Sequence, residues 1–146
     1  VSEPGDLKRM EIAGLLPLWV GITPADRSEI LLQKLTDPDR FWRTHGVPSL
    51  AADDPSYDPG ASTCCRWNGP AWVQWQWMMV RALLDQGEPD LAADLADRVS
   101  GSVTTVLARE HQFRELYDPD DENASNDSMP NYIWTAMVAQ VLHETN

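Results

Sequence analysis

The chain has 146 residues, 42% of them hydrophobic and 23% charged, and its net charge is −12. This length suits a single domain with one sizeable core, and a surface so negative repels nucleic acid and anionic membranes, so neither is expected as a partner. No apolar run approaches the roughly 20 residues of a membrane-spanning helix, and no signal peptide is visible. The two cysteines are adjacent and make no disulfide framework, so a reducing, cytoplasmic location is expected.

The first expected elements are an irregular segment and an amphipathic helix. Two glycines and a proline interrupt residues 11–22 too often for a long helix. Thr23 as N-cap and Pro24 at the first helical position then form a helix start signal. The pattern predicts a helix over 24–36, with one apolar stripe that contains Ile30, Leu31 and Leu35.

A long polar loop, residues 44–69, leads into a helix that is apolar on nearly all sides. Loops of this length inside a compact domain are usually functional when they are ordered. Pro70 is expected to open the helix, which the sequence places over 70–86. A helix that is apolar all round is buried all round.

The second half of the chain repeats this alternation. Gly87 and Pro89 predict a tight connection into a helix over 89–109, whose single apolar stripe is typical of a surface helix. A second long loop follows, and the last helix, over 131–143, is again apolar on most faces.

These elements predict an all-α fold, since no segment alternates with a period of two as a strand would. Buried helices that alternate with half-exposed ones are typical of an α/α toroid, in which an outer ring of helices surrounds an inner ring. Antiparallel neighbours would place both long loops on one rim, at the N-termini of the inner helices. Loops gathered at one end of a rigid scaffold are where function usually lies.

Seven short motifs follow one another in a distinctive order. They are Leu15-Leu16-Pro17-Leu18-Trp19, Asp37-Pro38, Gly46-Val47-Pro48, Asp53-Asp54-Pro55-Ser56-Tyr57, Trp67-Asn68-Gly69-Pro70-Ala71-Trp72, Phe113-Arg114-Glu115-Leu116-Tyr117-Asp118-Pro119 and Tyr132-Ile133-Trp134-Thr135-Ala136. In this order they resemble the C-terminal part of glycoside hydrolase family 63 and its bacterial relatives, which include mannosylglycerate and glucosylglycerate hydrolases. The resemblance covers nearly the whole chain from residue 11.

The resemblance implies a partial (α/α)6 barrel, with residues 1–146 as the C-terminal portion of a catalytic domain that hydrolyses α-glycosidic bonds with inversion. In such enzymes one carboxylic acid protonates the leaving oxygen and a carboxylate activates a water on the opposite face. Glu115 matches the general base. Trp67 and Trp72 match the aromatic walls of the sugar pocket, and Trp134 opens the last inner helix. The matching general acid belongs to a part of the barrel upstream of this chain.

Some residues keep two interpretations. A lone loop carboxylate is usually a solvated surface group, so the base role of Glu115 rests on its motif and on the predicted rim. Gly69 and Tyr57 are further candidates for sugar binding, although Tyr57 fits a solvated loop equally well. Trp75 and Trp77 lie deeper in the expected helix and are assigned to the core.

No metal or cofactor is expected. The adjacent Cys64 and Cys65 lack the spacing of a zinc site or of a disulfide framework. The acidic stretch 118–127 begins like a calcium-binding loop, but its sixth position is Asn123 and its twelfth is Met129, where such a loop carries Gly and Glu. A solvated turn therefore explains it better, with calcium as the alternative.

The expected partners are a carbohydrate substrate and either the remainder of the barrel or a second copy of the chain, because a partial toroid exposes the surface of its inner helices. The rival hypothesis is a non-catalytic helical-hairpin module that binds carbohydrate or a protein. Another chemistry on the same toroid, such as that of a lyase or a phosphorylase, also stays open at this point.

Overall fold

The structure is a computed structural model, and it describes residues 9–60, 66–124 and 128–145. Within these ranges it contains helices and isolated bridging pairs but no strand of a sheet. The helical elements, in chain order, are η2 (Ile12–Leu15), α1 (Leu16–Val20), α2 (Ala25–Leu35), α3 (Val73–Asp85), α4 (Pro89–Glu110), η3 (Ile133–Met137) and α5 (Val138–Thr145). No helix among the described residues is long and apolar enough to cross a membrane.

The four predicted helices are confirmed, but three of them begin differently. Pro70 does not open α3, because Ala71 exchanges two backbone hydrogen bonds with Tyr117, of 2.8 and 2.9 Å, and this pairing keeps the chain extended until Trp72. The last predicted helix is divided into the 3-10 turn η3 and the α-helix α5. At α2 the N-cap residue is Pro24 rather than Thr23, and no side chain caps the helix.

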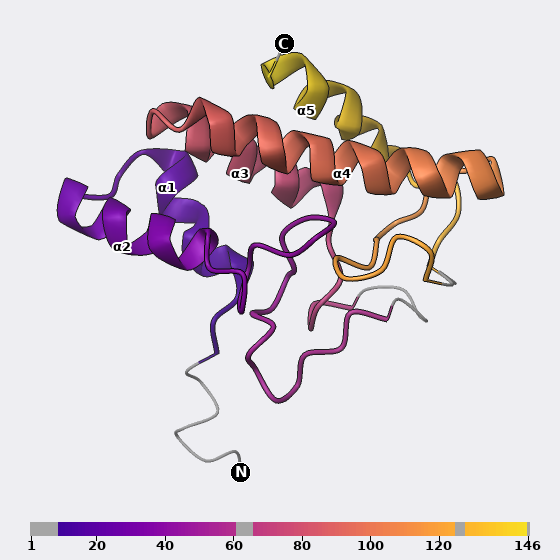
Figure 1. The fold of residues 1–146 in the computed structure, drawn as a ribbon, viewed down its shortest axis with the longest axis horizontal. Coiled ribbons are helices and arrows are strands. Elements are labelled where there is room, and N and C mark those ends of the chain that lie inside the picture. Colours follow the sequence, from indigo (N-terminus) through magenta and orange to yellow (C-terminus); the bar gives the residue numbers. More distant parts are fainter. Residues whose placement is uncertain (1–8, 61–65, 125–127, 146) are drawn as a thin grey trace.

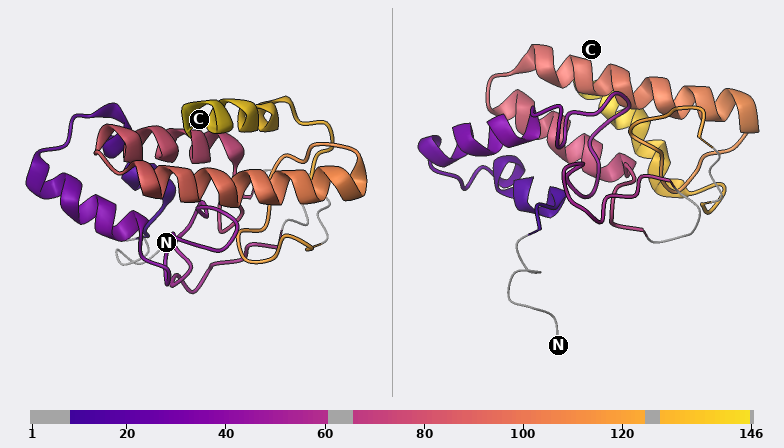
Figure 2. Two further views of the ribbon diagram at one scale, coloured as in Figure 1. Left: turned by 45° about the horizontal axis from the view of Figure 1, so that its top comes forward. Right: turned by 60° about the horizontal axis from the view of Figure 1, so that its bottom comes forward.

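The helices form two layers (Figures 1 and 2). In one layer α3 contacts α1 on one side and α5 on the other. In the second layer α4 packs across α3 and α5, while α2 packs against α1. The connection between α3 and α4 is short because Gly87 adopts a φ of +80°, a left-handed conformation that glycine tolerates. Consequently α3 and α4 are antiparallel.

Ring contacts and hydrogen bonds show that α3 and α5 run parallel. At the N-terminal ends of α3 and of η3, which leads directly into α5, Trp72 and Tyr132 approach to 6.5 Å between ring centroids. At their C-terminal ends, Glu144 accepts hydrogen bonds from Gln140 at 3.0 Å and from Arg81 at 2.8 Å. The bonds from Gln140 and Arg81 lower the pKa of Glu144 to about 2. Two parallel inner helices joined through an antiparallel outer helix match the expected alternation.

The open side of the inner layer remains uncovered by the described residues. Ile133 is 78% exposed and Trp134 is 52% exposed, and Leu142, Val20 and Ile22 are also exposed. The prediction that the last helix is buried on most faces is therefore wrong for this chain by itself. The physical reason is that one helical layer covers only one side of α5, and the surface that would cover the other side is not among these residues.

Both long loops lie at the end of the layers where α3 and η3 begin (Figures 1 and 2). Gln76 of α3 holds the first loop, since its side-chain oxygen accepts the Val47 N–H and its amide donates to the Val47 carbonyl, each at 2.8 Å. The two loops meet where the His45 N–H donates to the Pro119 carbonyl at 2.8 Å. The predicted rim is thus an ordered structure with its own hydrogen-bond network.

Candidate active site at the rim

Glu115 lies in an extended segment that is paired on both sides. Tyr117 pairs with Ala71 on one side, and on the other the Glu115 N–H donates to the Met129 carbonyl at 3.0 Å. Glu115 is only 4% exposed, and its Oε2 atom has no hydrogen-bond partner within the described residues. A buried carboxylate oxygen without a partner is rare in folded proteins, because desolvation of such a group is costly. Glu115 is therefore not the solvated surface residue that its loop position suggested.

A stacked pair of tryptophans lies beside this segment. The rings of Trp67 and Trp72 are 4.2 Å apart and 7° from parallel. Trp72 is buried, and its indole N–H donates to the Arg66 carbonyl at 3.0 Å, whereas Trp67 is 47% exposed. Both residues lie at the mouth of α3, as expected, but Trp67 presents the accessible ring and Trp72 supports it from behind.

The aromatic cluster extends through Tyr132 to Trp134. Tyr132 contacts Trp72 edge-on, and its ring centroid is 5.7 Å from that of Trp134 on η3. Burial and the nearby negative charge of Glu115 both raise the pKa of Tyr132. Leu116, which directly follows Glu115, packs in the same cluster as Trp72 and Tyr132, so the segment of the base candidate and the rim aromatics form one site. Tyr132 was missed as a site residue, although it opens the same motif as Trp134 and that position was an available signal.

Trp75 belongs to this cluster as well as to the core. Its ring meets that of Trp67 nearly at right angles at 5.9 Å, and it also packs against Trp72 and Leu116. Its indole nitrogen is buried without a partner in the described part of the chain. Trp77 matches its core assignment more closely, since it packs edge-on against Trp19 at 6.0 Å.

Gly69 and Tyr57 shape the loops around the site. Gly69 has a φ of +154°, and a Cβ there would lie 2.7 Å from the backbone carbonyl carbon of Asp58, so only glycine fits. The Tyr57 hydroxyl donates to Asp120 at 2.7 Å, and Asp120 also accepts from Arg43 at 2.6 Å. Burial and the bond to Asp120 raise the pKa of Tyr57. Both residues have roles in loop structure, and their contact with a sugar stays a prediction.

Comparison with known proteins identifies the family. The family model described as the mannosylglycerate hydrolase MGH1-like glycoside hydrolase domain matches residues 3–135. The chain belongs to this glycoside hydrolase family. It is 33% identical to a mannosylglycerate hydrolase of Thermus thermophilus over 73% of the chain and 23% of that relative. It is 29% identical to a periplasmic trehalase of Xanthomonas campestris over 77% of the chain and 18% of the relative.

Solved structures show the same likeness. A GH63 mannosylglycerate hydrolase from Thermus thermophilus in complex with Tris and D-glycerate matches with a TM-score of 0.72 and 27% identity. The match covers 94% of the present chain and 31% of that enzyme. The complex of the same enzyme with glucose gives a TM-score of 0.68. The predicted fold class is confirmed: this glycoside hydrolase chain is all-α and forms part of an α/α toroid, and it spans less than a third of the relatives it matches.

The acidic stretch of the chain forms a turn stabilised by its own backbone. Asp118 Oδ1 accepts the backbone N–H groups of Asp120 and Asp121 at 2.8 and 3.2 Å. Burial raises the pKa of Asp118. No group of three or more metal-ligating side chains converges among the residues described, and Cys64, Cys65 and residues 125–127 lie outside them.

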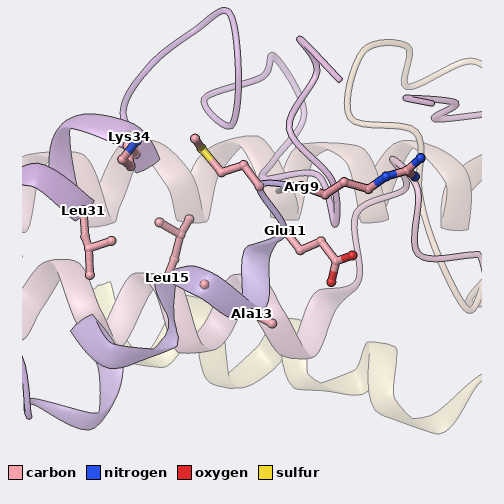
Figure 3. A pocket seen from close by; sticks show the side chains of 8 residues that line it. Arg9, Glu11, Ala13, Leu15, Leu31 and Lys34 are labelled. Carbon is pink, nitrogen blue, oxygen red and sulfur yellow. The ribbon is translucent and has the colours of Figure 1, made fainter. Parts of the chain in front are cut away.

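A hollow of about 470 Å³ lies elsewhere and shares no lining residue with the Glu115 rim. Figure 3 shows its lining side chains: Leu31 and Lys34 come from α2, and Ala13 and Leu15 come from η2. It is an open groove with a largely apolar floor, and the charged side chains of Arg9, Glu11 and Lys34 also line it.

Proposed function

We propose that this chain supplies the general base and the aromatic walls of an inverting α-glycoside hydrolase, as the C-terminal portion of its catalytic domain. One observation carries the proposal: in a chain of a glycoside hydrolase family, a buried carboxylate with an unpartnered oxygen directly precedes Leu116, which packs in the aromatic cluster of the rim. Glu115 is the base. Trp67 and Trp134 are the accessible stacking surfaces, and Trp72, Gly69 and Tyr57 complete the substrate-binding set.

The proposed reaction is a single displacement. Glu115 takes one proton from a water, the water oxygen bonds to the anomeric carbon, and the glycosidic bond breaks on the opposite face. The leaving oxygen receives a proton from a general acid that this chain does not contain. Aromatic rings suit the sugar because the apolar face of a pyranose lies flat on them while its hydroxyl groups find polar partners elsewhere.

The proposed substrate is a small α-mannoside or α-glucoside, or an oligosaccharide of these sugars. Relatives named mannosylglycerate hydrolase and periplasmic trehalase support a small α-linked substrate, as does the relative solved with glucose. The cytoplasmic location stays a prediction, since one of these relatives is named as periplasmic.

The proposed partner is the remainder of the catalytic barrel. The exposed side chains of Ile133, Trp134 and Leu142 on the open side of the inner layer support this proposal, and so does the apolar groove between η2 and α2. The rival function, a non-catalytic module, rests on the same exposed surface, which a second copy or another protein could cover. Sedimentation of the chain with and without a co-expressed upstream segment separates the two. A stable monomer that hydrolyses no glycoside in either preparation would favour the rival.

The test of the base is Glu115→Gln in the full-length enzyme. Gln keeps the shape and removes the charge, so the fold should persist while kcat falls at least about 100-fold. Glu122→Gln, which changes a partly exposed carboxylate on the same loop, is the matched control and should retain activity. Proton NMR of the first product anomer reports the stereochemistry. Normal turnover by Glu115→Gln, or a retained anomeric configuration, would refute the proposal.

A further inference from the structure

Tyr132 and Glu115 are held in a fixed relation by the pairing of their two segments. The Glu115 N–H donates to the Met129 carbonyl at 3.0 Å, and the Asn131 N–H donates to the Phe113 carbonyl at 2.6 Å. Just beyond Tyr132, the Thr135 hydroxyl donates to the Arg114 carbonyl at 2.5 Å. Bonds on both sides of Tyr132 thus tie it to the segment that carries the base.

The ring of Tyr132 is clamped in addition to its backbone. Trp72 contacts one part of it and Trp134 another, with centroid separations of 6.5 and 5.7 Å. Tyr132 also packs against the buried cluster of Trp72 and Leu116, and Leu116 directly follows Glu115. Because its aromatic neighbours restrict the ring, its hydroxyl group has a defined position at the rim.

The Tyr132 hydroxyl differs from those of the other two tyrosines. The Tyr57 hydroxyl donates to Asp120, and the Tyr117 hydroxyl accepts the Arg114 N–H at 3.2 Å. Within the described residues the Tyr132 hydroxyl has no hydrogen-bond partner, and neither has Glu115 Oε2. Two uncommitted polar groups therefore lie on paired segments at the aromatic rim, and the buried one, Glu115 Oε2, needs a partner that a bound molecule can supply.

We propose that Tyr132 is a positioning residue for the attacking water, which it holds together with Glu115. The water donates one hydrogen to Glu115 Oε2 and the other to the Tyr132 oxygen, which leaves a lone pair directed at the anomeric carbon. The new carbon–oxygen bond forms as the glycosidic bond breaks, one water proton passes to Glu115, and Tyr132 keeps its own proton. This inference rests on the proposed function.

Electrostatics supports this division of roles. Burial and the charge of Glu115 raise the pKa of Tyr132 above that of an ordinary phenol, so its hydroxyl group is neutral near neutral pH. A neutral phenol is a very weak base and cannot compete for the water proton. It fixes the orientation of the water and leaves the proton to Glu115.

The test uses Tyr132→Phe in the full-length enzyme with α-mannosyl and α-glucosyl fluoride as substrates. Fluoride leaves with little help from an acid, so its release reports the attack of water. Since one hydrogen bond is lost, kcat should fall about tenfold while KM stays within about twofold. Tyr117→Phe removes a hydroxyl that bonds to the backbone, and it should lower the melting temperature without this fall in kcat. An unchanged kcat for Tyr132→Phe refutes the inference, as does a raised KM with a normal kcat, which would mean that Tyr132 holds the sugar.

A double-variant cycle with Glu115→Gln isolates the coupling. If Tyr132 acts only on the water that Glu115 activates, adding Tyr132→Phe to the Glu115→Gln variant should lower kcat by less than about twofold. A further tenfold loss there refutes the coupling. Failure of the proposed function and failure of the inference about Tyr132 give different results. A wild-type enzyme that releases no fluoride contradicts the proposed function. If Glu115→Gln loses activity while Tyr132→Phe has normal activity, only the inference is contradicted.

Discussion

Replacing Gln76 by Leu should release the first rim loop from α3. Gln76 is fully buried, and its side chain makes three hydrogen bonds: two to the backbone of Val47, at 2.8 Å each, and one to the Trp72 carbonyl at 3.3 Å. Leu has a similar volume but offers no polar atom. In the variant the N–H and the carbonyl of Val47 stay buried and lose their partners.

The size of the effect follows from these two backbone groups. Each unsatisfied buried group costs about 1–3 kcal/mol, and the additional apolar surface of Leu returns about 1–2 kcal/mol. At the midpoints of these ranges, the free energy of unfolding should fall by about 2–3 kcal/mol. Activity should also fall, because the loop carries Ser49, whose hydroxyl accepts the Gly69 N–H at 3.1 Å.

Gln74 provides the matched control on the same helix. It is also buried, but its amide makes no hydrogen bond within the described residues, so Gln74→Leu should change stability by less than about 1 kcal/mol. Urea unfolding of the two variants and of the wild-type full-length enzyme measures the difference. Equal losses in both variants, or no loss in Gln76→Leu, would show that the hydrogen bonds to Val47 do not hold the loop.

Three further outcomes are expected. Gly69→Ala should cost about 2–4 kcal/mol, because its new methyl group would lie 2.7–2.8 Å from loop backbone atoms. Gly87 has a φ of +80°, but a Cβ added there would meet no atom within 4 Å. Gly87→Ala should therefore lower the free energy of unfolding by only about 1 kcal/mol in the same urea assay. Equal losses in the two variants would contradict the steric explanation. Trp72→Ala should lower the free energy of unfolding by about 3–5 kcal/mol, because the ring of Trp72 is buried. Trp67→Ala, at an exposed ring, should keep its stability and raise KM about tenfold. The reverse pattern in unfolding and kinetics would exchange the roles of the two residues. Since the pKa of Glu144 is lowered to about 2 in the folded protein, its stabilising contribution is present above the ordinary carboxyl pKa and is lost as the pH falls towards 2. Glu144→Gln should therefore flatten the decrease in melting temperature between pH 5 and pH 2, and an unchanged slope would argue against this assignment.

Helix positions and their order were predictable because they depend on local patterns. The apolar stripe that identifies α4, and the Gly87-Glu88-Pro89 connection before it, act through neighbours within a few residues. The start of α3 was not predictable, because Pro70 is a good first helical residue and only the distant Tyr117 holds Ala71 in an extended pairing. Here a long-range interaction overrides a local preference.

The sequence by itself determined the all-α class, the rim that carries the long loops, and Glu115 as the candidate base through its motif. Only the tertiary structure decided that Glu115 is buried with an unpartnered oxygen, that Trp67 is exposed while Trp72 supports it, and that the segment of Tyr132 pairs with that of the base. Burial and partnership depend on which segments meet. Residues 71, 115 and 132 are far apart in the chain, and the backbone pairing that brings their segments together has no periodic or compositional signal.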